Sequence, residues 1–111
     1  MTDLTRQTCT PCAPGTPPMD ADAVRAGLAA LPDWTLSDDG RAIVRRIEVK
    51  GFARAVQLAN VAAWLGERQG HHPDIRFGWG YCEVAFTTHA AGGLTRNDLI
   101  CAARFDALLG P

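Results

Sequence analysis

The sequence predicts a single α+β domain: an antiparallel four-stranded sheet with three helices packed on it, in the order α-β-β-α-β-β-α. Two observations lead to this fold class. Apolar residues recur every three or four positions in three segments, and they alternate with polar residues in four short ones. The length of 111 residues allows one two-layer core but not separate cofactor and substrate domains. We therefore expect residues 19–111 to form one domain.

Residues 1–18 differ in composition from the rest of the chain. Their second half contains Pro14, Gly15, Pro17 and Pro18, which neither bury apolar surface nor sustain a hydrogen-bonded ladder. We expect this segment to be a mobile tail. It also holds Cys9 and Cys12, but this spacing is only half of a four-cysteine site and gives weak support to a metal or redox role.

The first helix and the first hairpin are expected between residues 20 and 49. Apolar residues follow at helical spacing from Asp20, whose side chain can cap the first turn, and Pro32 cannot continue the helix. Residues 34–36 and 42–49 then read as two strands, because an Asp-Gly pair between them favours a tight turn.

A long central helix is expected over residues 52–69, in an alanine-rich segment without proline. Gly70 suits the left-handed conformation that closes a helix, and Pro73 biases the residue before it away from helical angles. A second hairpin should follow, with strands at 75–79 and 82–86.

The third helix is expected over residues 95–109. Thr95 and Asp98 have the spacing of a capping box, although aspartate is shorter than the usual glutamate. Apolar residues occur on both sides of this helix. Burial on both sides predicts a subunit interface, and we expect a homodimer or a homotetramer.

The three histidines of the chain lie at one end of the second predicted hairpin. If that hairpin turns about Gly80, His71 stands opposite His89, and directly opposed residues lie roughly 5 Å apart at Cβ. His71 and His72 also follow the C-terminus of the central helix, where the helix dipole favours imidazolium and hence a proton donor. An isolated histidine is usually a surface or hydrogen-bonded residue, but three at one hairpin end predict a shared site.

A zinc site is the main alternative for these histidines, with Glu67 or Cys82 as a further ligand. Adjacent His71 and His72 cannot easily bind one ion, and the sequence contains no HxH or HxxxH spacing. We therefore expect acid/base chemistry and no metal. Glu67 in the last turn of the central helix could serve the site or be an ordinary surface residue beside Arg68.

The residues around the histidines form a pattern with specific spacing. In order along the chain, the pattern consists of Glu67, His71, His72, Pro73, Trp79, His89 and Asp98. It resembles the signature of the pterin-4a-carbinolamine dehydratases, and the resemblance extends from about Val24 to the C-terminus. Two positions depart from the family pattern: Gly70 stands where many relatives carry an acidic residue, and Asn97 stands where an arginine is common.

The resemblance implies a reaction, a partner and a set of roles. The reaction is dehydration of a 4a-hydroxytetrahydropterin to quinonoid dihydropterin and water, without a cofactor, and it recycles the pterin of an aromatic amino acid hydroxylase. His71 and His89 would be the acid/base pair, with His72 binding and orienting the substrate. The further substrate-binding positions are Glu67, Asp98 and Trp79. Asp98 could equally serve as a helix cap, and an aromatic residue that alternates along a strand is more often part of the core.

Charge and hydropathy narrow the remaining possibilities. Lys and Arg number 11 against 12 Asp and Glu, without a basic stripe, so we expect no nucleic-acid partner. Because no stretch approaches the roughly 20 apolar residues of a membrane span, we also expect no membrane association and a cytoplasmic protein. Two other functions remain open: a non-catalytic dimerisation module that serves transcription regulators, and a zinc protein.

Overall fold

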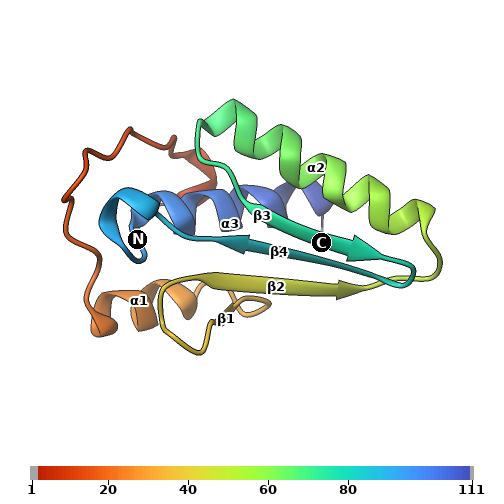
Figure 1. Ribbon diagram of the computed structural model, residues 1–111, viewed down its shortest axis with the longest axis horizontal. Coiled ribbons are helices and arrows are strands. Elements are labelled where there is room, and N and C mark those ends of the chain that lie inside the picture. The colour runs from red at the N-terminus through yellow and green to blue at the C-terminus, as the bar shows by residue number, and fades with distance from the viewer. Residues whose placement is uncertain (1–2, 111) are drawn as a thin grey trace.

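A computed structural model describes residues 3–110 and has the predicted order of elements (Figure 1). None of the helices in this range is long and apolar enough to cross a membrane. The elements are η1 (Leu4–Arg6), α1 (Ala21–Leu28), β1 (Thr35–Leu36), β2 (Ile43–Glu48), α2 (Ala53–Gln69), β3 (Asp74–Gly78), β4 (Tyr81–Phe86), η2 (His89–Ala91) and α3 (Arg96–Leu109), where η denotes a short 3-10 helix.

The four strands form one antiparallel sheet in the order β1-β2-β4-β3 (Figure 1). Alternation along β4 places Cys82, Val84 and Phe86 in the core, while the residues between them are only partly buried. The outer face carries ion pairs such as that between Arg76 and Glu83. One face of the sheet therefore packs on helices and the other faces solvent, which confirms the predicted fold class.

An aromatic cluster with one polar link joins α3 to the sheet. The ring centroid of Trp34 lies 5.8 Å from that of Phe86 and 6.2 Å from that of Phe105. The Trp34 indole nitrogen donates to both carboxylate oxygens of Asp106, at 3.0 and 3.1 Å. Arg45 on β2 donates to the same carboxylate at 2.5 Å. These contacts fix the orientation of α3, whose first turn reaches the histidines.

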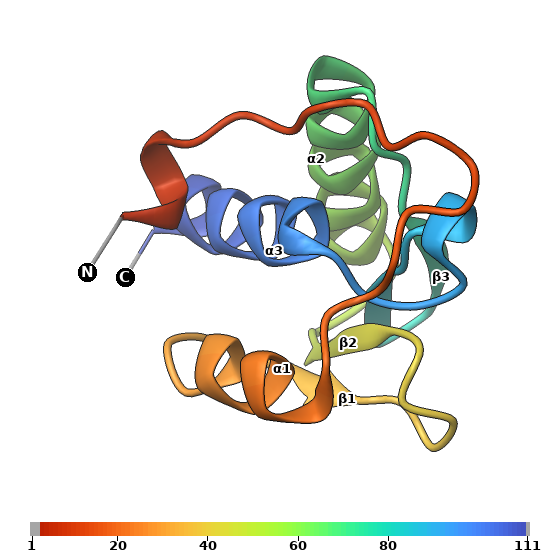
Figure 2. The same cartoon turned by 90° about the vertical axis from the view of Figure 1, so that its left-hand side faces the viewer.

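Helix α3 has neighbours from this one chain on both sides, so its two apolar sides do not by themselves require a subunit interface. One side packs on α2 and β4, and the other lies against α1 and the N-terminal segment (Figure 2). Leu99 and Ile100 are each only 3% exposed. The N-terminal segment thus accounts for part of this apolar surface, and a subunit interface stays a prediction.

The N-terminal segment, residues 3–18, makes specific contacts with the domain. Figure 2 shows it running from η1, beside α3, past η2 to α1. The Thr10 amide donates to the Asn97 side-chain oxygen at 3.1 Å, and the Asn97 amide group donates back to the Thr10 carbonyl at 2.7 Å. Arg104 donates to the backbone carbonyl of Gln7 at 2.6 Å. Mobility of this tail stays a prediction, and these hydrogen bonds oppose it.

The register of the second hairpin differs by one residue from that of a hairpin that turns about Gly80. Asp74 pairs with Ala85 and Gly78 with Tyr81, so the turn consists of Trp79 and Gly80. Gly80 has φ of 91°, a conformation that other residues rarely adopt. With this register His71 and His89 are not directly opposed, and both lie beyond the paired ends of β3 and β4.

Candidate active site

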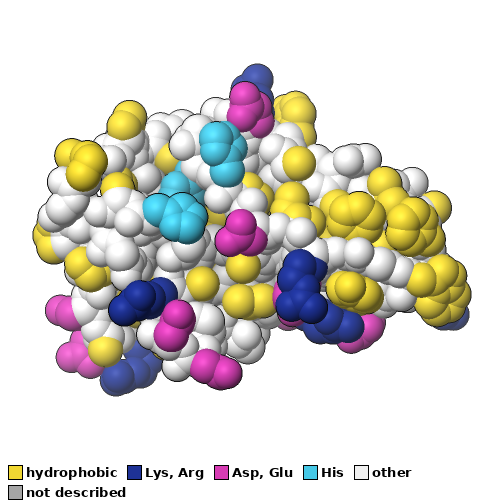
Figure 3. Space-filling view, in the orientation of Figure 1, with side chains coloured by type: hydrophobic (Ala, Val, Ile, Leu, Met, Phe, Trp, Pro, Cys, Tyr) yellow, Lys and Arg dark blue, Asp and Glu magenta, His cyan; other side chains and the backbone are white. Residues whose placement is uncertain are grey.

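The three histidines line one pocket of about 460 Å³. His71 and His72 come from the connection between α2 and β3, and His89 comes from η2, directly after β4. Figure 3 shows the histidine side chains close together on one face of the molecule. The remaining wall includes Thr10, Cys12, Thr88 and Asn97. Although the strand register differs from the prediction, the fold still brings these histidines together.

The end of α2 fixes the position of His71. Gly70 adopts the left-handed conformation, with φ of 64°, and its amide donates to the Glu67 carbonyl at 3.2 Å. The His71 amide donates to the Gly66 carbonyl at 3.0 Å, which completes a Schellman motif. A Cβ atom at Gly66 would lie 2.4 Å from Cδ of Pro73, so only glycine allows the following segment to fold back onto the helix.

A buried carboxylate holds the His71 ring. Its Nε2 lies 2.5 Å from Oδ1 of Asp98, which is fully buried in the first turn of α3. The other carboxylate oxygen accepts hydrogen bonds from the Thr88 hydroxyl at 2.8 Å and from the Thr95 amide at 2.9 Å. The latter bond belongs to the predicted capping box. Asp98 therefore caps α3 and orients His71 at the same time.

The surroundings of His71 favour its charged form. Burial lowers the pKa of the imidazole. The hydrogen bond to Asp98 and the charge of that carboxylate together raise the pKa by more than burial lowers it, so the net shift is upward. The ring also stacks on Phe86, with centroids 6.1 Å apart and planes at 11°. Since Nε2 is bound to Asp98, Nδ1 is the nitrogen left for exchanging a proton with a bound molecule.

His72 and His89 are far more exposed than His71. His72 Nε2 lies 3.0 Å from Oε1 of Glu67, and both side chains are mostly exposed, so this contact adds little stability. His89 opens η2 and faces solvent beside the pocket. The site thus combines one buried, oriented imidazole with two that a small molecule could reach from outside.

Trp79 is the predicted site residue that neither lines the pocket nor contacts one of its histidines, whereas Glu67 and Asp98 each bind a pocket histidine. It lies in the turn between β3 and β4, at the opposite end of the hairpin from the histidines, and its side chain is 76% exposed. It contributes neither to the pocket wall nor to the core. Alternation with Ile75 and Phe77 suggested a strand position, but β3 ends at Gly78.

Several pocket residues were missed in the sequence. Thr10 and Cys12 belong to the segment expected to be mobile, and Thr88 had no recognisable signal before the partners of Asp98 were known. Asn97 was noticed only as a departure from a family pattern, yet its side chain binds the backbone of Thr10. The one usable signal was the position of Asn97, a polar residue in the first turn of a capped helix and next to Asp98.

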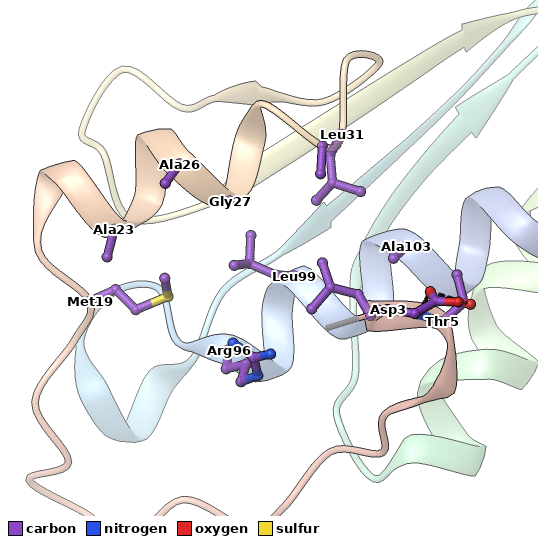
Figure 4. A pocket seen from close by; sticks show the side chains of 12 residues that line it. Asp3, Thr5, Met19, Ala23, Ala26, Gly27, Leu31, Arg96, Leu99 and Ala103 are labelled. Carbon is purple, nitrogen blue, oxygen red and sulfur yellow. Dashed lines mark hydrogen bonds between the residues drawn. The ribbon is translucent and has the colours of Figure 1, made fainter. Parts of the chain in front are cut away.

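A larger cavity of about 640 Å³ lies between α1 and α3 (Figure 4). Met19, Leu31 and Leu99 dominate its wall, with Asp3 and Arg96 as its charged residues. It contains no histidine, cysteine or other group suited to proton transfer near neutral pH. We therefore place the candidate active site at the histidine pocket. Within residues 3–110, no three His, Cys, Asp or Glu side chains are arranged to hold a metal ion.

The fold and the pocket together define an α+β domain with a pocket lined by histidines, one of which is bonded to a buried carboxylate. Comparison with known proteins places this domain more closely. A sequence model described as "Pterin 4 alpha carbinolamine dehydratase" matches residues 17–108. The chain therefore belongs to the pterin 4 alpha carbinolamine dehydratase family.

Individual relatives agree with this assignment. A protein of Paracoccus denitrificans (strain Pd 1222), provisionally named pterin-4-alpha-carbinolamine dehydratase, is 54% identical over 96 residues, covering 86% of this chain and 90% of the relative. A protein of Methylococcus capsulatus (strain ATCC 33009 / NCIMB 11132 / Bath) with the same provisional name is 43% identical over 105 residues, covering 95% and 92%. A crystal structure described as a transcriptional coactivator/pterin dehydratase from Brucella melitensis has a TM-score of 0.77 at 28% identity, covering 84% of this chain and 99% of that one.

Proposed function

We propose that the chain catalyses dehydration of a 4a-hydroxytetrahydropterin to quinonoid dihydropterin and water. Family membership supports the substrate class, and the histidine pocket supports the type of chemistry. The observation that carries the proposal is the pair formed by His71 and the fully buried Asp98, 2.5 Å apart on the wall of a pocket that also holds His72 and His89.

In this reaction His71 acts as the acid. The 4a-hydroxyl leaves as water only after it receives a proton, and an imidazolium held by Asp98 is available to supply one. His89, from the other side of the pocket, accepts the proton that the pterin ring loses as nitrogen electrons expel the hydroxyl. The elimination has no net oxidation. Afterwards His89 releases one proton to solvent and His71 takes one up, which returns both histidines to their starting states.

The remaining polar residues bind and orient the pterin. His72 is exposed at the pocket and can donate or accept a hydrogen bond, and Glu67 beside it limits its orientation. Asp98 acts through His71, since it is fully buried and is bonded to Thr88 and Thr95. We propose no substrate contact for Trp79.

The test is to generate the carbinolamine with a pterin-dependent aromatic amino acid hydroxylase and to follow its ultraviolet absorbance. The chain should speed the formation of quinonoid dihydropterin well above the uncatalysed rate, and boiled protein should not. No acceleration by folded protein over a range of concentrations would refute the proposal. Such a hydroxylase would be the metabolic source of the substrate in the cytoplasm.

Self-association into a homodimer or homotetramer also stays a proposal. Light scattering on the full chain measures it directly, and a mass equal to one chain at all concentrations would contradict it. Substitutions at Leu99 or Ile100 cannot serve as interface variants, because both side chains lie in the core of a single chain. A transcriptional-cofactor role is the alternative proposal: the description of the Brucella melitensis structure supports it, whereas the contacts of α3 with η1 weaken the argument from its second apolar side.

A further inference from the structure

Three of the four cysteines of the chain lie beside the histidine pocket. Cys9 Sγ in the N-terminal segment lies 3.5 Å from Cys101 Sγ on α3, across a sequence separation of 92 residues. Cys12 lines the pocket, and its sulfur lies 3.4 Å from the side-chain nitrogen of Asn97. All four thiols are reduced in this structure. Neither the fold nor the proposed dehydration gives this cluster a role.

Hydrogen bonds on both sides hold Cys9 against α3. Its own amide donates to the Gln69 side-chain oxygen at 2.9 Å. The next residue, Thr10, exchanges two hydrogen bonds with the Asn97 side chain, at 3.1 and 2.7 Å. Cys101 is fully buried in α3, so its position is fixed by the core. The contact between the two sulfur atoms is thus held by hydrogen bonds of the N-terminal segment on one side and by burial in α3 on the other.

The pair is also polarised. The hydrogen bond from the Cys101 thiol lowers the pKa of Cys9, and the charges of His71 and Arg104 act in the same direction, against burial and the charge of Asp98. The same hydrogen bond, together with burial, raises the pKa of Cys101. Of the two thiols, Cys9 therefore has the lower pKa; it is also partly exposed, and a more acidic, accessible thiol is the more reactive one.

We propose that Cys9 and Cys101 form a disulfide when the protein meets a peroxide-class oxidant. The Cys9 thiolate attacks one peroxide oxygen, the O–O bond breaks, and Cys9 becomes a sulfenic acid while hydroxide leaves. The Cys101 sulfur then attacks the sulfenic sulfur, forming the S–S bond and releasing water after proton transfer. In total, two thiols and one hydrogen peroxide give one disulfide and two waters.

Geometry favours Cys101 over Cys12 as the resolving thiol. The sulfur atoms of Cys9 and Cys101 need to close from 3.5 Å to a bond length of about 2.05 Å. The Cys12 sulfur lies instead near the Thr10 carbonyl, at 3.9 Å, and near Asn97. A sulfenic acid at Cys9 is neutral, so oxidation also removes the Cys9 charge that raises the pKa of Cys101.

The disulfide would attach one wall of the histidine pocket covalently to α3. Thr10, Pro11 and Cys12 line that pocket and directly follow Cys9. In the reduced protein, hydrogen bonds with the Asn97 side chain hold Thr10 beside α3 without a covalent link. In the oxidised protein residues 10–12 could no longer swing away from α3. Opening of the pocket on this side would therefore respond to oxidant.

The test is chemical and does not depend on dehydratase activity. The full chain is treated with hydrogen peroxide or with dithiothreitol, alkylated and digested with trypsin without reduction. Cleavage after arginine places Cys9 and Cys12 in peptide 7–25, Cys101 in peptide 97–104 and Cys82 in peptide 77–96. We expect peptide 7–25, alkylated at Cys12, linked to peptide 97–104, with a mass two hydrogens below the sum of these two peptides, in the oxidised sample alone.

Two variants assign the bond. Cys12→Ser should keep the link, which shows that Cys9 is the partner in peptide 7–25. Cys101→Ala should abolish it, and Cys9→Ser, in the partly exposed segment, provides the same loss if the buried substitution does not fold. Amide hydrogen exchange of Thr10 and Cys12 should slow on oxidation of the wild type but not of Cys9→Ser.

Two results would overturn the proposal. One is an internal disulfide within peptide 7–25, which would identify Cys12 as the partner of Cys9. The other is full alkylation of all cysteines after peroxide treatment of the folded wild type. Neither result would affect the proposed dehydration, whose assay is run under reducing conditions.

Discussion

Replacing Asp98 by asparagine tests how the buried carboxylate controls His71. The side chain keeps its shape and one oxygen, but the charge is lost. The Thr95 amide can only donate, so the remaining oxygen must face Thr95 and Thr88, and the new NH₂ group must face Nε2 of His71. The substituted side chain therefore demands a neutral imidazole with its proton on Nδ1. The pKa of His71 falls, because its largest favourable interactions disappear.

The magnitudes follow from the burial of the pair. A hydrogen bond to a charged group contributes about 1.5–3 kcal/mol, and Asp98 is fully buried, so the free energy of unfolding should fall by about that amount. Loss of a positioned acid should lower the rate constant of dehydration by roughly 10²- to 10⁴-fold. Stopped-flow absorbance measures the rate, and urea unfolding measures the stability. Asp38→Asn, in an exposed turn, is the matched control for removal of one negative charge.

The pH dependence separates a charge effect from simple unfolding. The chain has only three histidines, so imidazole proton signals in NMR report each pKa directly. In wild type the His71 signal should titrate above the ordinary value, and in folded Asp98→Asn it should titrate at lower pH. A folded variant with an unchanged His71 titration and an unchanged dehydration rate would refute the reasoning.

Three further predictions concern the same site. Gly66→Ala should cost about 1–3 kcal/mol of unfolding free energy and reduce activity, because the added Cβ collides with Pro73; Asn60→Ala on the exposed side of α2 should do neither. Folding raises the pKa of His71, so the stability lost in His71→Gln should be largest below about pH 6.5 and should shrink as pH rises through the folded-state pKa. Urea unfolding at several pH values measures this loss, and a loss that grows with pH would contradict the prediction. Trp79→Ala should leave kcat/KM for dehydration unchanged, and a large loss would return this residue to the substrate site.

Local sequence signals were sufficient for most of the fold. Asp20 and Thr95 are residue types that cap the start of a helix, and Gly70 is the type that ends one. The observed helices begin or end beside these residues. The register of the second hairpin was harder to predict from the sequence, because Gly78 and Gly80 allow the turn at more than one position. The observed turn at Trp79 and Gly80 shifted every pair in that hairpin by one residue.

The site was partly predictable for a related reason. Histidines at one end of a hairpin come together even when the register slips, so the pocket survived the error. The Asp98 contact and the wall formed by Thr10 and Cys12 depend on long-range packing of α3 and the N-terminal segment, which no local pattern encodes. Composition predicted a mobile tail because that argument considers only the residues of the tail itself. It does not consider side chains elsewhere in the chain, such as Asn97, which binds the backbone of Thr10.

The central claim is that His71 and His89 exchange protons with one bound pterin. A double-mutant cycle on kcat/KM for carbinolamine dehydration tests it most directly, with His71→Ala, His89→Ala and the double variant compared with wild type. We expect each single variant to lose roughly 10²- to 10⁴-fold and the double variant to lose less than the product of the two, since acid and base act in one step. Rates equal to wild type in both single variants and in the double variant would contradict the claim.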